Sequence, residues 1–127
     1  MKGRPIRDSQ FKSLVGELRK LKQLEAVWVH GGVLSGATLR ELGQLKHLRG
    51  LVLERTGLTD AGLAEILAEL PQLTELHLIG VPVTDVSVDA ICSLSHLTKL
   101  RLKARPLSDD VREKLKRELP DCEFSWR

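Results

Sequence analysis

The stretch LRGLVLERTGLTDAGLAEILAELP, residues 48–71, decides the fold of this chain. Leu48, Leu51 and Leu53 give it an LxxLxL spacing, in which alternate residues share one face of a short strand. After a bend, apolar residues recur at helical spacing, at Leu63, Ile66 and Leu70. One strand and one helix cannot bury these side chains alone, because each needs a neighbouring unit to cover it. The stretch therefore predicts a stack of similar units.

The spacing recurs along the chain, with first residues separated by 24, 25 and 24 positions. Its copies are Leu24-Val27-Val29, Leu48-Leu51-Leu53, Leu73-Leu76-Leu78 and Leu97-Leu100-Leu102. A further apolar residue follows each copy, at Leu34, Leu58, Val83 and Leu107. Polar pairs suited to helix N-capping come next: Ser35-Gly36, Thr59-Asp60, Thr84-Asp85 and Ser108-Asp109. The predicted helical stripes are Leu39/Leu42/Leu45, Leu63/Ile66/Leu70, Val88/Ile91/Leu94 and Val111/Leu115/Leu119.

The two ends of the chain differ from the repeats and predict caps. Residues 1–7 form a basic lead-in, and Asp8 or Ser9 can cap a helix behind it. The apolar stripe expected for that capping helix is Phe11, Leu14, Val15, Leu18 and Leu21. We thus expect one domain over 1–127, with a lead-in and capping helix at 1–23, four repeats at 24–119 and a C-terminal cap at 120–127. Met1 and the two caps favour a complete unit.

The last segment, PDCEFSWR, starts like another repeat and stops. If Cys122 takes the first leucine place, Phe124 falls one position early for the inward-facing set. Either the register slips by one and buries Phe124 and Trp126 as a capping strand, or Trp126 points outward. The buried cap is favoured, because an exposed terminal strand edge needs covering. Cys92 and Cys122 are expected to pack as small apolar side chains.

The whole pattern resembles leucine-rich repeats over about residues 11–127, and TGLTDAGL (56–63) resembles a segment of the ribonuclease-inhibitor-like and F-box-associated types. The resemblance implies an α/β right-handed solenoid with a concave parallel sheet and convex helices. Where the family often has Asn or Cys at the strand end, this chain has Gly32, Thr56, Val81 and Arg105. Only Thr56 could supply part of the family's side-chain ladder to the backbone. No F-box segment is present, so a ubiquitin-adaptor role is not carried over.

Composition narrows the classes of function. Lys and Arg outnumber Asp and Glu by 20 to 17, a net charge of +3 that suits an acidic partner but does not indicate nucleic acid. The N-terminal segment lacks the apolar core of a signal peptide. No run approaches the roughly 18 apolar residues of a membrane span. The two cysteines, 92 and 122, give neither a disulfide framework nor metal-ligand spacing. We expect a reduced, cytoplasmic protein that binds neither nucleic acid nor membrane.

Strand alternation predicts which residues line the concave face. They are Trp28, His30, Val52, Glu54, His77, Ile79, Lys99, Arg101 and Lys103, flanked by Ala26, Gly50 and Glu75. An exposed Trp beside apolar residues and then Arg has the composition of an interaction hot spot. The alternative is that Trp28 folds onto the N-terminal helix as part of its cap. The basic cluster at 99–105 favours an acidic protein surface, because no aromatic residues interleave its charges.

Catalytic signals are weak. His47 and His96 hold equivalent places before two strands, which marks them as turn residues. His30, Glu54 and His77 could be drawn as a metal site, but the histidines lie two strands, roughly 10 Å, apart. No HExxH, GxSxG, phosphate loop or dinucleotide fingerprint occurs. We therefore expect no catalytic residue, cofactor or metal, and no enzyme.

Two functions remain. The first is a non-catalytic protein–protein interaction module, or scaffold, that binds a protein partner on its concave sheet face. The alternative is a structural or assembly subunit that docks into a larger complex through its ends or its helical face. The sequence predicts neither the partner's identity nor the oligomeric state.

Overall fold

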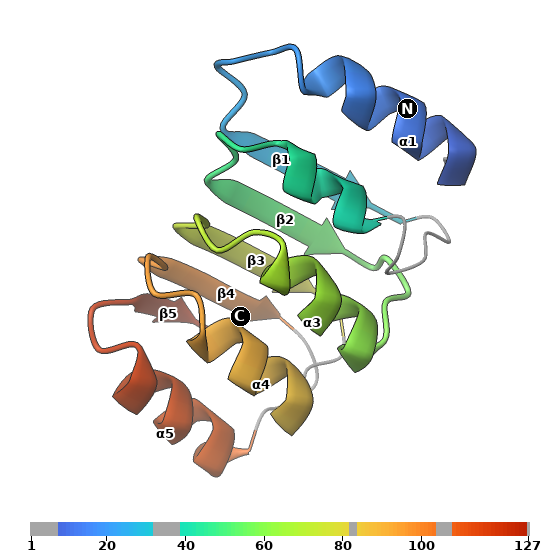
Figure 1. The fold of residues 1–127 in the computed structure, drawn as a ribbon. Helices are drawn as coiled ribbons and strands as arrows, with labels where there is room; N and C mark the ends of the chain where they lie inside the picture. The colour runs from blue at the N-terminus through green and yellow to red at the C-terminus, as the bar shows by residue number, and fades with distance from the viewer. Residues whose placement is uncertain (1–7, 32–38, 82–83, 104–107, 127) are drawn as a thin grey trace.

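The computed structural model describes residues 8–31, 39–81, 84–103 and 108–126, in which strands and helices alternate (Figure 1). The strands are β1 (Ala26–His30), β2 (Gly50–Glu54), β3 (Glu75–Ile79), β4 (Lys99–Lys103) and β5 (Glu123–Ser125). The helices are α1 (Asp8–Leu18), the 3-10 helix η1 (Arg40–Gln44), α3 (Asp60–Ala68), α4 (Asp85–Cys92) and α5 (Asp109–Glu118). Among these residues, no helix is both long and apolar enough to cross a bilayer.

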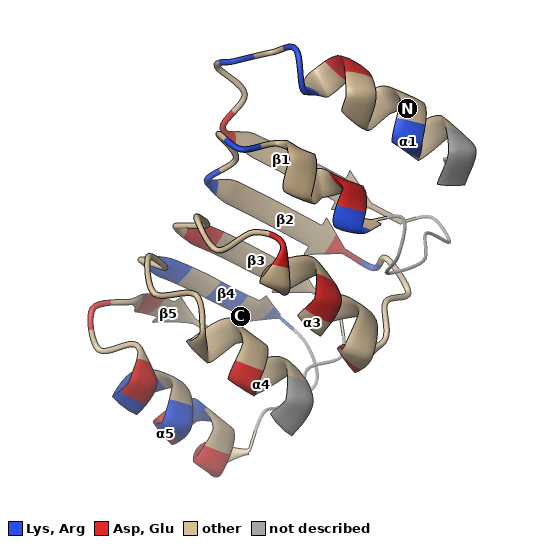
Figure 2. Ribbon diagram, in the orientation of Figure 1, with Lys and Arg blue, Asp and Glu red and all other residues tan. Residues whose placement is uncertain are grey.

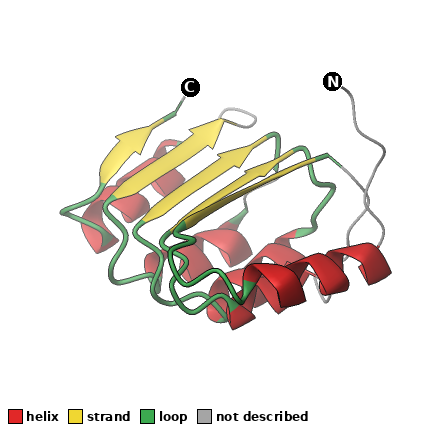
Figure 3. Ribbon diagram, turned by 90° about the horizontal axis from the view of Figure 1, so that it is seen from above, coloured by secondary structure: helices red, strands yellow, loops and turns green. Residues whose placement is uncertain are grey.

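The strands form one parallel five-stranded sheet in the order β1-β2-β3-β4-β5. The described helices lie on one face of this sheet and leave the other uncovered, as the view in Figure 3 shows. We call the uncovered side the open face. Because sequential strands are neighbours in space, each helix returns the chain to the next position of the sheet. The arrangement fits an α/β leucine-rich-repeat solenoid.

The core lies between sheet and helices and consists mainly of the leucines of the repeated spacing. Leu51, Leu53, Leu76 and Leu78 are fully buried, and the helical Ile66 packs among them. The LxxLxL prediction is therefore confirmed for β2 to β4. The first copy differs, because Leu24 and Val27 are only partly buried.

Successive units are joined by a recurring backbone link before each strand. The carbonyl of Glu25 accepts hydrogen bonds from the amides of Arg49 and Gly50, at 2.7 and 2.8 Å. The carbonyl of Thr74 does the same for Thr98 and Lys99, at 2.7 and 3.1 Å. These paired bonds hold consecutive strands in an unshifted register, so that equivalent residues of each unit stand side by side.

The predicted N-caps are confirmed at two helices and wrong at a third. Thr59 Oγ1 accepts from the Gly62 amide at 3.1 Å, and the Ser108 side chain caps α5. Thr84 makes no side-chain cap bond. Its backbone amide instead donates to Asp60 Oδ1 at 3.1 Å, and the buried Ser87 hydroxyl donates to the same oxygen at 2.5 Å. A side chain of the preceding unit has therefore taken over the start of α4.

The N-terminal helix buries a narrower stripe than predicted. Phe11 and Val15 are buried and Leu18 is partly buried, but Leu14 is 44% exposed and Leu21 is 55% exposed. The stripe prediction is wrong for these two leucines. The helix ends at Leu18, so Leu21 lies beyond it, and no described element covers the outer side of Leu14.

The described part of the first unit's helical segment consists of Leu39, which is α-helical, and the 3-10 helix η1 that follows it. Leu39, Leu42 and Leu45 are buried as predicted. Gly43 explains the close approach of η1 to the end of α3, since a Cβ at this position would lie 2.8 Å from Glu69 Cβ. A larger residue there would push the two units apart.

The residue directly after each of β1, β2 and β3 has a positive φ: Gly31 at 70°, Arg55 at 51° and Gly80 at 67°. Glycine adopts this conformation readily at two of these positions, whereas Arg55 is a non-glycine residue in the left-handed region. Thr56, the residue that could have supplied part of the family's side-chain ladder, is buried, but its Oγ1 has no hydrogen-bond partner among the described residues. Val81, the next equivalent position, is buried as part of the core. The predictions for 1–7, Gly32, Leu34, Ser35-Gly36, Val83, Arg105 and Leu107 lie outside the described residues.

The C-terminal segment forms a capping strand by the predicted one-residue slip. The Cys122 amide donates to Leu119 O at 3.1 Å, as the Leu97 amide does to Leu94 O. β5 begins one residue after Cys122, whereas β4 begins two residues after Leu97. As a result, Phe124 pairs with Leu100. Phe124 and Trp126 stack with centroids 5.2 Å apart and pack against the core, and the Arg112 guanidinium carbon lies 5.5 Å from the Trp126 ring centroid. Both rings are half-buried.

Candidate functional site

The parallel register arranges the open face as three rows that cross the strands. The row nearest the strand starts is Ala26, Gly50, Glu75, Lys99 and Glu123. The middle row is Trp28, Val52, His77, Arg101 and Ser125. The third row is His30, Glu54, Ile79 and Lys103. The structure thus brings together on one surface the residues that the sequence assigned to the concave face.

The β1 end of this face carries an exposed aromatic ring, and each of the next two strands adds one aliphatic side chain to the face. Trp28 is 67% exposed, which does not fit the alternative in which it folds away as part of the N-terminal cap. Val52, its neighbour in the middle row, is half-buried, as is Ile79 in the third row. A large accessible ring beside the partly covered Val52 provides an anchor for an apolar group of a partner.

The two histidines of the face pair with different carboxylates. His30 Nε2 lies 3.5 Å from Glu54 Oε2, and His77 Nε2 lies 2.7 Å from Glu75 Oε2. The three side chains drawn as a metal site therefore do not converge. Among the described residues, no group of three or more His, Cys, Asp or Glu side chains could hold a metal ion.

The β4 end of the face is basic, but acidic neighbours limit its charge (Figure 2). The register places Lys99 between Glu75 and Glu123. The register places Arg101 between His77 and Ser125, and Lys103 beside Ile79. The three cations of this end therefore all come from one strand, β4, with one in each row.

A small hollow of ≈ 140 Å³ opens on the face between β3, β4 and β5. Its polar lining comes from His77, Lys99, Arg101, Glu123 and Ser125. Sequence reasoning missed the last two residues, because the strand register of the C-terminal cap differs from that of the repeats. The sequence does carry a signal for this difference. Two residues, Thr98 and Lys99, separate Leu97 from Leu100, whereas Glu123 alone separates Cys122 from Phe124.

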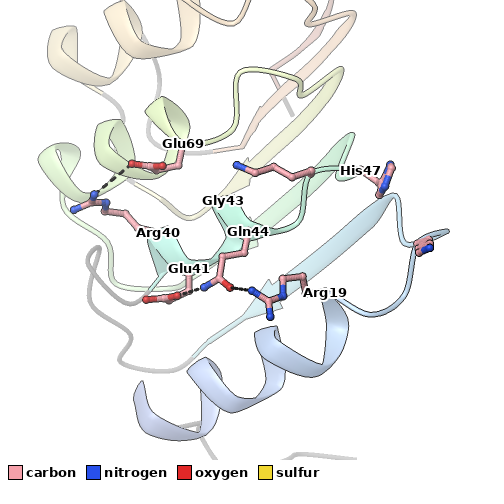
Figure 4. A pocket seen from close by; sticks show the side chains of 9 residues that line it. Arg19, Arg40, Glu41, Gly43, Gln44, His47 and Glu69 are labelled. Carbon is pink, nitrogen blue, oxygen red and sulfur yellow. Dashed lines mark hydrogen bonds and ion pairs between the residues drawn. The ribbon is translucent and has the colours of Figure 1, made fainter.

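A larger hollow of ≈ 740 Å³ lies on another side of the molecule, beside η1 (Figure 4). Figure 4 shows Gln44 between Arg19 and Glu41, and Arg40 reaching Glu69. Arg19 donates to Gln44 Oε1 at 3.1 Å, Gln44 donates to Glu41, and Arg40 lies 3.3 Å from Glu69. These contacts join α1, η1 and α3, so the polar groups of this hollow hold the N-terminal helices together.

Neither thiol has the character of a nucleophile. Burial, with a smaller contribution from Glu123, raises the pKa of Cys122 to about 11. Burial also raises the pKa of Cys92, which is partly buried against the core. Thiolate is the reactive form, so both side chains are largely protonated and unreactive near neutral pH.

The chain was compared with protein-family models, with curated proteins and with solved structures, and the solved structures gave matches. No protein-family model matches the chain, and no curated protein matches it. Among solved structures, it is similar to a leucine-rich repeat protein of Leptospira interrogans, with a TM-score of 0.50 and 23% sequence identity. The match covers 87% of this chain and 27% of the other, so the chain spans about a quarter of that protein's length. At this identity the likeness shows the fold, and the fold of this chain is that of a leucine-rich repeat protein.

Proposed function

We propose that this chain is a non-catalytic protein–protein interaction module that binds its partner on the open face. The observation that carries the proposal is the exposed Trp28 in one row with Val52 and Arg101, on a sheet face that no described helix covers. Aromatic residues and arginine are enriched among the side chains that dominate binding energy at protein interfaces. The fold supports the proposal, since stacked repeats present an extended surface for binding.

The chemistry of the face indicates an acidic segment as the ligand. Trp28 and Arg101 lie three strands apart, a separation of roughly 14 Å at about 4.8 Å per strand. An extended chain covers that distance in about four residues. We therefore expect an apolar partner residue on Trp28 and an acidic residue about four positions away, near Arg101 and Lys103. Nucleic acid is a poorer ligand, because no aromatic ring lies among these cations to stack on bases.

Two finer assignments belong to the same proposal. The TGLTDAGL segment supports a repeat of the ribonuclease-inhibitor-like type. The two protonated, unpaired cysteines are compatible with the reducing conditions of the cytoplasm, where we expect the protein to act.

The test is an affinity pull-down that compares the wild-type chain with a Trp28→Ala/Arg101→Ala variant. Circular dichroism first establishes that both proteins fold alike. Arg117→Ala, an exposed cation of α5 away from the face, is the matched charge control. A captured protein is then identified by mass spectrometry, purified and titrated against all three proteins.

We expect the double variant to bind at least about thirty-fold more weakly than wild type, the loss typical of a hot spot. The control should bind as the wild type does. Equal binding by all three proteins would contradict the open-face proposal and move the contact to an end or to the helices.

A second candidate is assembly into a larger complex through an end of the stack. The exposed Leu14 and Leu21 favour it, since both lie in the N-terminal cap and neither belongs to the open face.

A further inference from the structure

The N-terminal end of the stack leaves its core incompletely covered. Leu24 and Val27 are only partly buried, whereas Leu48 and Leu51, which hold the same places one unit later, are fully buried. The helix side of this end is occupied by α1, whose Phe11 and Val15 belong to the core. The uncovered side of Leu24 and Val27 is therefore the side on which a preceding strand would lie. Within residues 8–31, 39–81, 84–103 and 108–126, β1 is thus the strand that has no preceding strand beside it.

Exposed apolar side chains gather at the same end. Among the described residues, the large hydrophobic side chains that stand exposed are Leu14, Leu21 and Trp28. They come from α1, from the turn after it and from β1, the first elements of the chain (Figure 1). Trp28 stands on the open face, whereas Leu14 and Leu21 lie outside that face, so exposed apolar side chains occur on more than one side of this end.

The backbone of β1 presents unused hydrogen-bonding groups toward this end. The Gly31 amide bonds the Glu54 carbonyl of β2, and the Glu25 carbonyl accepts from Gly50 of β2. Successive residues of a strand direct their backbone groups to opposite sides. The amides and carbonyls of Ala26, Trp28 and His30 therefore point away from β2, and β2 is the strand neighbour of β1 among the described residues.

Nothing in the composition of β1 protects this edge. The strand AVWVH has no Lys, Glu, Pro or bulge, the devices that usually block pairing at a sheet edge. The opposite edge, β5, is three residues long, carries Glu123 and packs its aromatic rings onto the core. The two edge strands of the sheet thus differ in length and composition, and of the two only the β1 edge is suited to accept a further strand.

We propose that the outer edge of β1 is a docking site for an extended segment of a partner protein, which adds to the sheet as a further parallel strand. The segment repeats this chain's own LxxLxL pattern: its spaced apolar residues cover Leu24 and Val27, and its backbone bonds Ala26, Trp28 and His30. The site uses backbone groups and does not depend on partner binding at the open face.

The chain itself supplies the probe. Residues 48–54, LRGLVLE, form the strand that natively lies beside β1 and β3, with Leu51 and Leu53 directed inward. The Arg55 amide bonds Ile79 of β3, so the amides of Leu51 and Leu53 point to the following strand. A synthetic, end-capped peptide of 48–54 should use the same two amides to bond the β1 edge.

The experiment titrates the full chain with this peptide, up to about 1 mM, while amide hydrogen exchange is followed residue by residue. We expect the amides of Ala26, Trp28 and His30 to exchange fast in the free chain and at least tenfold more slowly with peptide. N-methylation of the peptide at Leu51 and Leu53 should abolish that protection. N-methylation at Gly50 and Val52, whose amides point away from β1, should leave it intact.

A variant of the chain gives the reciprocal test. Ala26→Pro/His30→Pro removes two outward amides while keeping the bonds to β2, as proline is tolerated on the free side of an edge strand. It should bind the peptide at least tenfold more weakly, whereas Ala26→Thr/His30→Thr, which keeps both amides, should bind normally. The peptide variants decide the matter if the proline variant does not fold.

Three results would overturn the proposal. The first is slow exchange of Ala26, Trp28 and His30 in the free chain, which would mean that the edge is already covered. The second is equal protection by the two N-methylated peptides, which would show a contact without strand pairing. The third is a dimer in analytical ultracentrifugation that the proline variant loses, which would assign the edge to a second copy of this chain.

Discussion

The two ends of the stack solve the same problem differently. Any stack of strand–helix units has a first and a last unit with an uncovered side. At the C-terminal end, Phe124 and Trp126 stack on each other against the core, and Arg112 lies over the indole. At the N-terminal end, α1 covers the helix side, but Leu24 and Val27 remain partly exposed beside a strand edge with which no described strand pairs.

The difference lies in residues outside the repeated pattern. The C-terminal strand is displaced by one residue from the repeat register, and this slip directs both aromatic rings to the core side. The N-terminal unit keeps the repeat register, so its exposed aromatic residue, Trp28, stands on the open face. The C-terminal end, which departs from the repeat register, covers its own core with aromatic side chains. The N-terminal end, which keeps the repeat register, leaves Leu24 and Val27 partly exposed.

The largest expected effect compares equivalent leucines at the end and in the interior. Leu48→Ala should lower the free energy of unfolding by about 2–5 kcal/mol, because a fully buried side chain leaves a cavity. Leu24→Ala removes the same atoms from a partly exposed site, so the loss should be about 1 kcal/mol. Urea unfolding of both variants measures the difference. Equal losses would mean that the N-terminal end is as well covered as the interior.

The next comparison concerns the two tryptophans. Trp126→Ala should cost about 1–3 kcal/mol, because it removes the stacking on Phe124 and the contact with Arg112. Trp28→Ala should change stability by less than about 0.5 kcal/mol, as expected of an exposed side chain. Thermal unfolding of the two variants, each against wild type, tests the assignment. A large loss for Trp28→Ala would show that this ring supports the fold and would weaken its role as a binding residue.

The sequence predicted most of the interior of the fold. Strand positions, the inward leucines of β2 to β4 and the three rows of the open face follow from a two-residue alternation repeated every 24 or 25 positions. Such a pattern is strong because a one-residue slip would turn every leucine to solvent. For the same reason, the one slip that does occur, before Phe124, could be inferred from the chain end.

The errors lie where one unit meets the next. The Thr84 cap was wrong because the pattern treats each unit alone, whereas Asp60 reaches forward from the preceding one. The stripe of α1 was wrong because helical spacing shows which side chains share a face but not whether an element covers them. The large hollow beside η1 was not foreseen, since Arg19, Arg40 and Glu69 are far apart in the chain.

The smallest expected effect tests a joint between two interior units. Asp60 accepts hydrogen bonds from the Thr84 amide and the Ser87 hydroxyl of the next unit, at 3.1 and 2.5 Å. Asp60→Ala should lower the free energy of unfolding by about 1–2 kcal/mol, since it leaves the buried Ser87 hydroxyl without its acceptor. Asp109 starts α5 as Asp60 starts α3, but it is exposed and is followed by the capping strand alone. Asp109→Ala is therefore the matched control for a negative charge in the first turn of a helix.

The pH dependence of this joint has a definite sign. Burial alone would raise the pKa of Asp60, but the hydrogen bonds from Ser87 and Thr84 outweigh it and hold the pKa below the usual 3.8. A group whose pKa is lower in the folded state stabilises the fold above its unfolded pKa, and the contribution disappears as the pH falls through the folded value. The stability difference between wild type and Asp60→Ala should thus be full at pH 7 and shrink as the pH falls below about 4. Urea unfolding at pH 7, 5 and 3 measures it. A difference that stays constant with pH would mean that the charge of Asp60 takes no part in the joint, and that its hydrogen bonds contribute equally when the carboxyl group is protonated.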